Sequence, residues 1–158
     1  TDVTTASIDS ITIRRAEPLG GYTVVAEAEW LGGDNGAPAF FEINDETQFN
    51  RANVHRDGSG GTLRQYSEGD DVGRTILSGV SVAAGEVFTV AASYASNDHA
   101  VSVNGSVPGT WDSAPIPTAP TQLQIGVGSN TQQDNWSIRR LTIIPRAVSD
   151  AELQSLSS

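Results

Sequence analysis

Two consecutive stretches in the first half of the chain carry side chains that can recognise a sugar. Because successive residues of a β-strand point to opposite faces, each stretch separates into an inward and an outward set. The outward set holds guanidinium, amide and aromatic groups: Arg51, Asn53, His55, Arg64 and Tyr66. Guanidinium and amide groups hydrogen-bond hydroxyls, and aromatic rings contact the apolar side of a pyranose. The pattern predicts a glycan-binding sheet face.

Four residues later in the chain extend this predicted site: Trp111, Gln124, Asp134 and Trp136. Gln124 is an outward position of its strand, and Trp111 lies in a loop-like segment where an aromatic ring either covers the core edge or stacks on a sugar. Trp136 follows a polar loop and is either a stacking platform or a packing residue. Trp30, by contrast, continues an apolar alternation and is predicted to be in the core.

A solvated sheet face explains the same outward residues without any ligand. Antiparallel sheets commonly expose one polar face to water, and cross-strand pairs such as Arg with Tyr stabilise it. For the stretch 37–44, alternation predicts that Ala39, Phe41 and Ile43 point inward. The residues between them would then point outward: Phe40, Glu42 and Asn44.

Catalysis would require a pair of carboxylates. Glu27 and Glu29 share one face of a strand and are about 6 to 7 Å apart by strand rise. Inverting glycosidases use a separation of roughly 6.5 to 9.5 Å. However, the sequence contains no Ser-His-Asp ordering, phosphate loop or zinc signature. We therefore expect a non-enzymatic protein in which both residues belong to the solvent face of an amphipathic strand.

No organic cofactor is expected, and the metal content is left open. A bound calcium ion would need several oxygens converging from loops. The loops offer these candidates: Asp34, Asn35, Asp70, Asp71, Asp98, Asn130 and Asp134. None of them has the spacing of a dedicated calcium loop, and acidic loop residues are usually solvated.

Composition limits the partners. The 158 residues have a formal net charge of −10, which disfavours nucleic acid and anionic membranes as partners. There is no Cys, so no disulfide framework is expected. No apolar stretch is long enough for a transmembrane helix and no signal peptide is evident. The chain could be a whole small protein or a fragment, and we expect one domain over residues 1–158.

Apolar alternation between Gly, Pro, Asn and Asp turn signals predicts an all-β protein. The expected strands are Ser7–Arg15, Tyr22–Leu31, Ala37–Asn44, Asn50–Arg56, Thr62–Ser67, Arg74–Val82, Glu86–Tyr94, His99–Asn104, Thr121–Gly128 and Asn135–Ile144. Asn104-Gly105 is typical of a tight hairpin turn. A short helix is expected over Ser149–Leu156, with Ser149 as N-cap and Glu152 completing a capping box.

The second half of the chain resembles the concanavalin A-like, laminin G-like jelly rolls. The resemblance rests on the strand at 88–94, the Asn104-Gly105 turn, the Leu-Gln-Ile-Gly segment at 123–126, and the closing run from Ile138 to Leu156. It is closest to the jelly rolls of tailed-phage virion proteins, although Trp136 stands where those relatives usually carry Gly. The resemblance implies a two-sheet antiparallel sandwich with a C-terminal helix. It also allows a calcium ion at the rim of the sandwich, because many laminin G-like domains hold one there.

The resemblance also implies a function. The expected role is a non-catalytic carbohydrate-binding module on a tail fibre, spike or capsid, whose partners are host-surface or environmental glycan and other virion proteins. It would be located on the virion surface, outside the cell, and could form homo-oligomers. The alternative is a capsid decoration protein without a glycan site, and a less favoured one is a glycoside hydrolase.

Overall fold

The computed structural model describes residues 20–33, 39–47, 49–58, 60–69, 72–118, 120–126 and 135–158. The described residues form two antiparallel β-sheets and one helix, which confirms the predicted fold class. The predicted strand Ser7–Arg15 lies outside the described residues. No helix in the described ranges is long and apolar enough to cross a membrane.

The two sheets each contain five strands and are drawn from both halves of the chain. The first sheet has the order β10 (Trp136–Ile144), β1 (Gly21–Trp30), β6 (Val87–Ala95), β7 (Asp98–Val103) and β8 (Gly109–Trp111). The second sheet has the order β5 (Val72–Ser81), β4 (Thr62–Gly69), β3 (Arg51–Arg56), β2 (Ala39–Asn44) and β9 (Gln122–Ile125).

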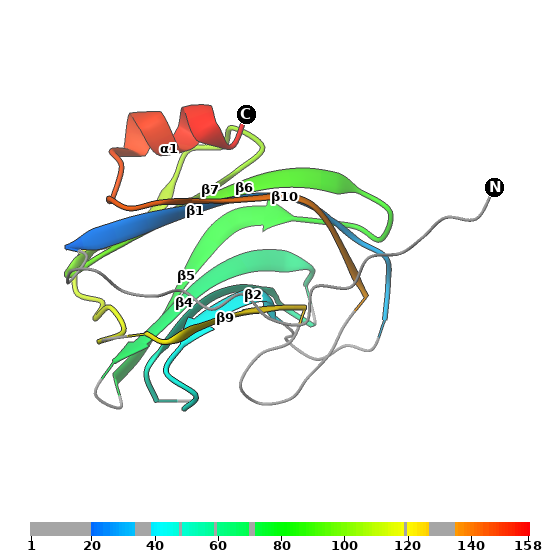
Figure 1. Ribbon diagram of the computed structural model, residues 1–158. Helices are drawn as coiled ribbons and strands as arrows, with labels where there is room; N and C mark the ends of the chain where they lie inside the picture. The colour runs from blue at the N-terminus through cyan, green and yellow to red at the C-terminus, as the bar shows by residue number, and fades with distance from the viewer. Residues whose placement is uncertain are drawn as a thin grey trace.

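The core lies between the two sheets, which are stacked face to face (Figure 1). Their inner faces supply a continuous apolar cluster, in which Phe40, Phe88 and Tyr94 are among the largest fully buried side chains. Polar contacts also join the layers. Tyr94 Oη donates to the backbone oxygen of Asn53 at 2.9 Å, and Gln65 Nε2 donates to the backbone oxygen of Ser93 at 2.8 Å. These hydrogen bonds therefore attach β3 and β4 of the second sheet to β6 of the first sheet through the core.

The helix α1 (Asp150–Leu156) covers the outer face of the first sheet, on the side away from the second sheet (Figure 1). Ser149 caps it as predicted, because the Ser149 side chain accepts a hydrogen bond from the backbone N–H of Glu152. Leu153 packs with Val25 and Ala91 in a small second core. In the part of the chain that the structure describes, no helix covers the outer face of the second sheet.

A β-bulge in β2 makes two of the predicted side-chain directions wrong. The pairing between β2 and β3 shifts between Ala39 and Phe41, so Phe40 is an extra residue. Phe40 and Phe41 both enter the core, where each has 0% of its surface exposed. Ala39 is paired with His55 and faces outward with it. Uninterrupted alternation predicts Phe40 outside and Ala39 inside, and the bulge reverses both directions.

Candidate functional site

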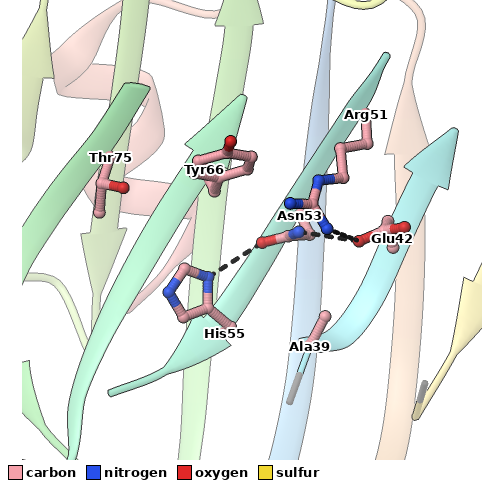
Figure 2. A pocket seen from close by; sticks show the side chains of 7 residues that line it. All are labelled: Ala39, Glu42, Arg51, Asn53, His55, Tyr66 and Thr75. Atoms are coloured by element: carbon pink, nitrogen blue, oxygen red, sulfur yellow. Dashed lines mark hydrogen bonds and ion pairs between the residues drawn. The ribbon is translucent and has the colours of Figure 1, made fainter. Parts of the chain in front are cut away.

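An open pocket of about 220 Å³ lies on the outer face of the second sheet. Its lining comes from β2, β3, β4 and β5: Ala39, Glu42, Arg51, Asn53, His55, Tyr66 and Thr75 (Figure 2). This volume is below the roughly 300 to 1,000 Å³ of pockets that enclose drug-sized ligands. The pocket suits one small polar unit, and its open side allows a longer ligand to continue along the sheet.

Strand register arranges the outward residues in rows across the sheet. Residues that are directly opposite each other in antiparallel strands share a face. One row runs through Gln124, Glu42, Asn53, Tyr66 and Thr75. The neighbouring row runs through Gln122, Asn44, Arg51, Glu68 and Gly73. Residues far apart in the sequence therefore form one polar surface.

Glu42 is at the centre of this surface and has 0% of its area exposed. Its Oε1 accepts a hydrogen bond from Asn44 Nδ2 at 2.8 Å, and its Oε2 accepts one from Asn53 Nδ2 at 2.9 Å. Arg51 Nη1 lies 3.8 Å from the same Oε2. A buried charge is tolerated when it is paired and hydrogen-bonded in this way. The carboxylate therefore fixes the orientation of the amides on both sides of it.

The orientation of the Asn53 amide determines the tautomer of His55. Because Asn53 Nδ2 donates to Glu42, Asn53 Oδ1 is the atom that faces His55 Nδ1, at 3.0 Å (Figure 2). An amide oxygen can only accept, so His55 Nδ1 must carry a proton. In the neutral imidazole, Nε2 is then a hydrogen-bond acceptor, and it has no partner among the described residues. The pocket thus presents an acceptor suited to a hydroxyl donor.

Tyr66 supplies the aromatic surface of the pocket and is held by Arg51 and Glu68. Its hydroxyl donates to Glu68 Oε2 at 2.7 Å, and the Arg51 guanidinium carbon lies 4.9 Å from its ring centroid. Arg51 Nε donates to the same Glu68 oxygen at 3.2 Å. Gly73 lies under the Tyr66 hydroxyl, where a Cβ atom would collide with it. The ring is therefore fixed before any ligand binds.

Burial and the positive charges of Arg64 and Arg51 lower the pKa of His55 to about 4. Since this is below the ordinary value of 6.5, His55 is expected to remain neutral at pH 5.5 and to become protonated only near pH 4. Folding stability should fall as the pH drops from about 6.5 toward 4, because the unfolded chain takes up the proton first.

The measurement for this prediction is an NMR titration of the imidazole ring. His99 is the only other histidine, and burial also lowers its pKa to about 4, so the His99 resonance is identified in a His55→Asn variant. A His55 midpoint near 6.5 would contradict the proposed tautomer and its environment.

The structure brings four of the predicted site residues into the pocket: Arg51, Asn53, His55 and Tyr66. Arg64 is opposite His55 but does not line the pocket, and its Nη2 pairs with Asp57 Oδ2 at 2.6 Å. Gln124 is linked to the pocket through Asn44, whose Nδ2 donates to Gln124 Oε1 at 3.1 Å. Their role in binding stays a prediction.

Both predicted tryptophans lie away from the pocket. Trp111 is on β8 at the edge of the first sheet, with 42% of its surface exposed. Trp136 packs toward the core, with its ring centroid 5.6 Å from that of Phe40 and 6.2 Å from that of Phe88. Its position favours a packing role over a rim platform. Asp134 lies outside the described residues.

No group of three or more potential metal ligands of the His, Cys, Asp and Glu types occurs in the described residues. Of the calcium candidates, only Asp98 is described, and the other six fall outside. Glu27 and Glu29 flank Arg139, with carboxylate oxygens 3.9 and 3.0 Å from its guanidinium nitrogens. The former glycosidase candidates therefore form an ion-pair cluster on the first sheet.

Three pocket residues, Glu42, Thr75 and Ala39, are not among the site residues predicted from the sequence. Glu42 was assigned to the outward face, but a buried Glu is rare and nothing local marks it as the centre of a network. The sequence signal that points to it is the spacing of Asn44 and Asn53, whose amides are both suited to a carboxylate. The bulge hid Ala39, and Thr75 needs the pairing of β4 with β5 to reach the pocket.

No protein family and no curated protein matches the chain in sequence. Solved structures do match in fold. CBM40 of the Ruminococcus gnavus IT-sialidase has a TM-score of 0.73 at 16% identity, over 96% of this chain and 97% of that one. Domain 4 of the Geobacillus stearothermophilus arabinanase AbnA has a TM-score of 0.72 at 15% identity, over 88% of this chain and 67% of that one.

A third neighbour is the mouse laminin alpha1 chain, domains LG4-5, with a TM-score of 0.67 at 11% identity. It covers 89% of this chain and 40% of that one. At these identities the likeness concerns the fold. Together with the sheet order and the C-terminal helix, it shows that the chain has a jelly-roll sandwich fold similar to that of these domains.

Proposed function

We propose that the protein is a non-catalytic glycan-binding module whose site is the pocket on the outer face of the second sheet. The observation that carries this proposal is the hydrogen-bond network around Glu42. The network orients Asn53 and His55 and leaves His55 Nε2 as an acceptor beside the Tyr66 ring. A merely solvated sheet face does not need a buried carboxylate, and burying one is costly without such partners.

Charge favours an uncharged ligand. Two carboxylates, Glu42 and Glu68, share Arg51, with distances of 3.8 and 3.2 Å to its nitrogens. The guanidinium is thus engaged within the protein by these two carboxylates. Neutral hydroxyl groups match the amide, imidazole and phenol groups of the pocket, whereas the carboxylate of an anionic sugar would have to compete with Glu42 and Glu68 for Arg51.

The structural neighbours support a glycan as the class of ligand. CBM40 of the Ruminococcus gnavus IT-sialidase has been solved with sialyllactose, and domain 4 of AbnA with arabinotriose. Sialyllactose is acidic and arabinotriose is neutral, so the fold accommodates both kinds. Because Arg51 is already paired with Glu42 and Glu68, we propose a neutral glycan as the ligand of this chain.

A binding role is favoured over hydrolysis because the pocket carboxylates are already engaged. Both Glu42 oxygens accept from side-chain amides, and Glu68 Oε2 accepts from Tyr66 and Arg51. A glycosidase needs one carboxyl group to protonate the leaving oxygen and another to act on the sugar or on water. Neither Glu42 nor Glu68 is arranged for such a role.

The residues that close the chain support a further part of the proposal, display on a tailed-phage particle. From their resemblance to virion jelly rolls we propose that the module is displayed on a tail fibre, spike or capsid, with other virion proteins as partners. In the alternative, a capsid decoration protein, the sheet face would have no ligand. Purified protein would then add to undecorated capsids at a fixed stoichiometry, and a glycan array would stay blank.

Tyr66→Ala is expected to weaken glycan binding by about tenfold or more, because it removes the aromatic surface and frees Arg51 to move. The measurement is calorimetric titration with a neutral glycan that the wild type retains on an array. The melting temperature should change little, since the Tyr66 side chain is outside the core. Thr110→Ala on β8 serves as a control and should bind like the wild type. Unchanged affinity in Tyr66→Ala would contradict the assignment of the pocket.

A further inference from the structure

The polar surface continues beyond the pocket to the edge strand β9, through three amide side chains. Asn44 Nδ2 donates to Glu42 Oε1 at 2.8 Å and to Gln124 Oε1 at 3.1 Å. Asn44 Oδ1 accepts from the backbone N–H of Glu46 at 3.0 Å. Both amide hydrogens of Asn44 are therefore used, and its orientation is fixed.

The orientation of Asn44 determines the orientation of the two amide side chains on β9, Gln124 and Gln122. Gln124 accepts through Oε1, so its Nε2 is the group that donates to Gln122 Oε1, at 3.1 Å. A primary amide has two N–H donors. Among the described residues, one N–H of Gln124 and both N–H groups of Gln122 remain without an acceptor. Each amide oxygen, in contrast, already accepts a hydrogen bond.

Glu42 sets this direction because a carboxylate can only accept. Reversing the side-chain amide of Asn44, Gln124 or Gln122 would place two N–H groups or two oxygens against each other. The edge of the sheet at β9 therefore presents an excess of donors, while the pocket presents the acceptor Nε2 of His55. The two ends of the surface have opposite hydrogen-bonding character.

We propose that Gln122 and Gln124 form a second subsite, which binds the carbonyl oxygen of an acetamido group on a neutral glycan. This inference rests on the proposed function of the pocket. An uncharged carbonyl matches unused N–H donors, and the nearby Glu42 disfavours a carboxylate in the same place. Strands are spaced about 4.8 Å apart, so Gln124 lies roughly 10 Å from Asn53. A ligand that reaches both subsites must contain more than one sugar ring.

The test is a glycan array of matched neutral pairs in which one member carries acetamido groups where the other carries hydroxyl groups. N-acetyllactosamine and lactose differ at one carbon, and triacetylchitotriose and cellotriose differ at C2 of each of their three rings. The acetylated members are expected to be retained about fivefold or more strongly, the effect of one added hydrogen bond. Gln122→Glu should remove most of this preference, because the new side chain can still accept from Gln124 but lacks the two N–H donors of Gln122, which leaves only the unused N–H of Gln124. Val107→Glu adds the same charge at a side chain that is 79% exposed, between β7 and β8, and should keep the preference.

The possible results separate the subsite from the pocket. Retention of glycans without preference for the acetylated member would overturn the second subsite and leave the proposed function intact. A preference that is undiminished in Gln122→Glu would also overturn it, because the donors would then be elsewhere. Failure of the wild type to retain any neutral glycan would overturn the subsite and the proposed function together.

Discussion

Glu42→Gln is expected to lower the free energy of unfolding by about 2 to 4 kcal/mol. The new amide has one oxygen and one NH₂ group, whereas Asn44 and Asn53 both donate to the present carboxylate. At least one donor would face another N–H group in a buried position, and Arg51 would lose a partner at 3.8 Å. Chemical denaturation followed by tryptophan fluorescence measures the change.

Glu27→Gln is the matched control for this substitution. Glu27 also pairs with an arginine, at 3.9 Å, but its side chain is partly exposed. Exposed ion pairs contribute at most about 1 kcal/mol, so this variant should lie within roughly 0.5 kcal/mol of the wild type. If the two variants were equally stable, the network around Glu42 would not be the organising element of the face.

Trp136→Gly is expected to reduce stability by roughly 3 kcal/mol or more, because it removes a large ring from an aromatic cluster. The Trp136 ring contacts Phe40 and Phe88, and those two rings are themselves 6.1 Å apart. The indole Nε1 is buried and has no hydrogen-bond partner among the described residues, which reduces the net benefit of the ring. Thermal and chemical denaturation provide the measurement.

Trp111→Gly is the control, since its ring is 42% exposed and its Nε1 donates to Ser113 Oγ at the surface. Its cost should stay below about 1.5 kcal/mol, most of which reflects Gly in a strand. Neither variant should change glycan affinity at a temperature where it is folded. If the Trp136→Gly protein were as stable as the wild type but lost glycan binding, Trp136 would be a binding residue and not a packing residue.

The sheet face could be predicted where strands are regular. In β3 and β4, strict alternation separates Val54 and Leu63 in the core from Asn53, His55 and Tyr66 outside. Side-chain direction has a period of two, so an uninterrupted strand is sufficient to assign each residue to a face. The capped helix was also predictable, because its N-cap signal is local.

Prediction failed where the answer depends on pairing between strands. The bulge at Phe40 reverses the assignment of Ala39 and Phe40, and only the register with β3 reveals it. The strand β8 was not predicted, because three residues are too few for a visible alternation. Glu42 looked like an ordinary exposed acid. Its burial arises from Asn44, Asn53 and Arg51, which reach it from two strands.

We propose above all that the outer face of the second sheet binds a neutral glycan. The most direct measurement is the retention of the wild-type protein on an array of neutral and sialylated glycans, repeated with Tyr66→Ala. The account predicts that a defined set of neutral glycans is retained, that sialylated glycans are not preferred, and that Tyr66→Ala loses the set while remaining folded. A blank array, or the same set retained by Tyr66→Ala, would contradict it.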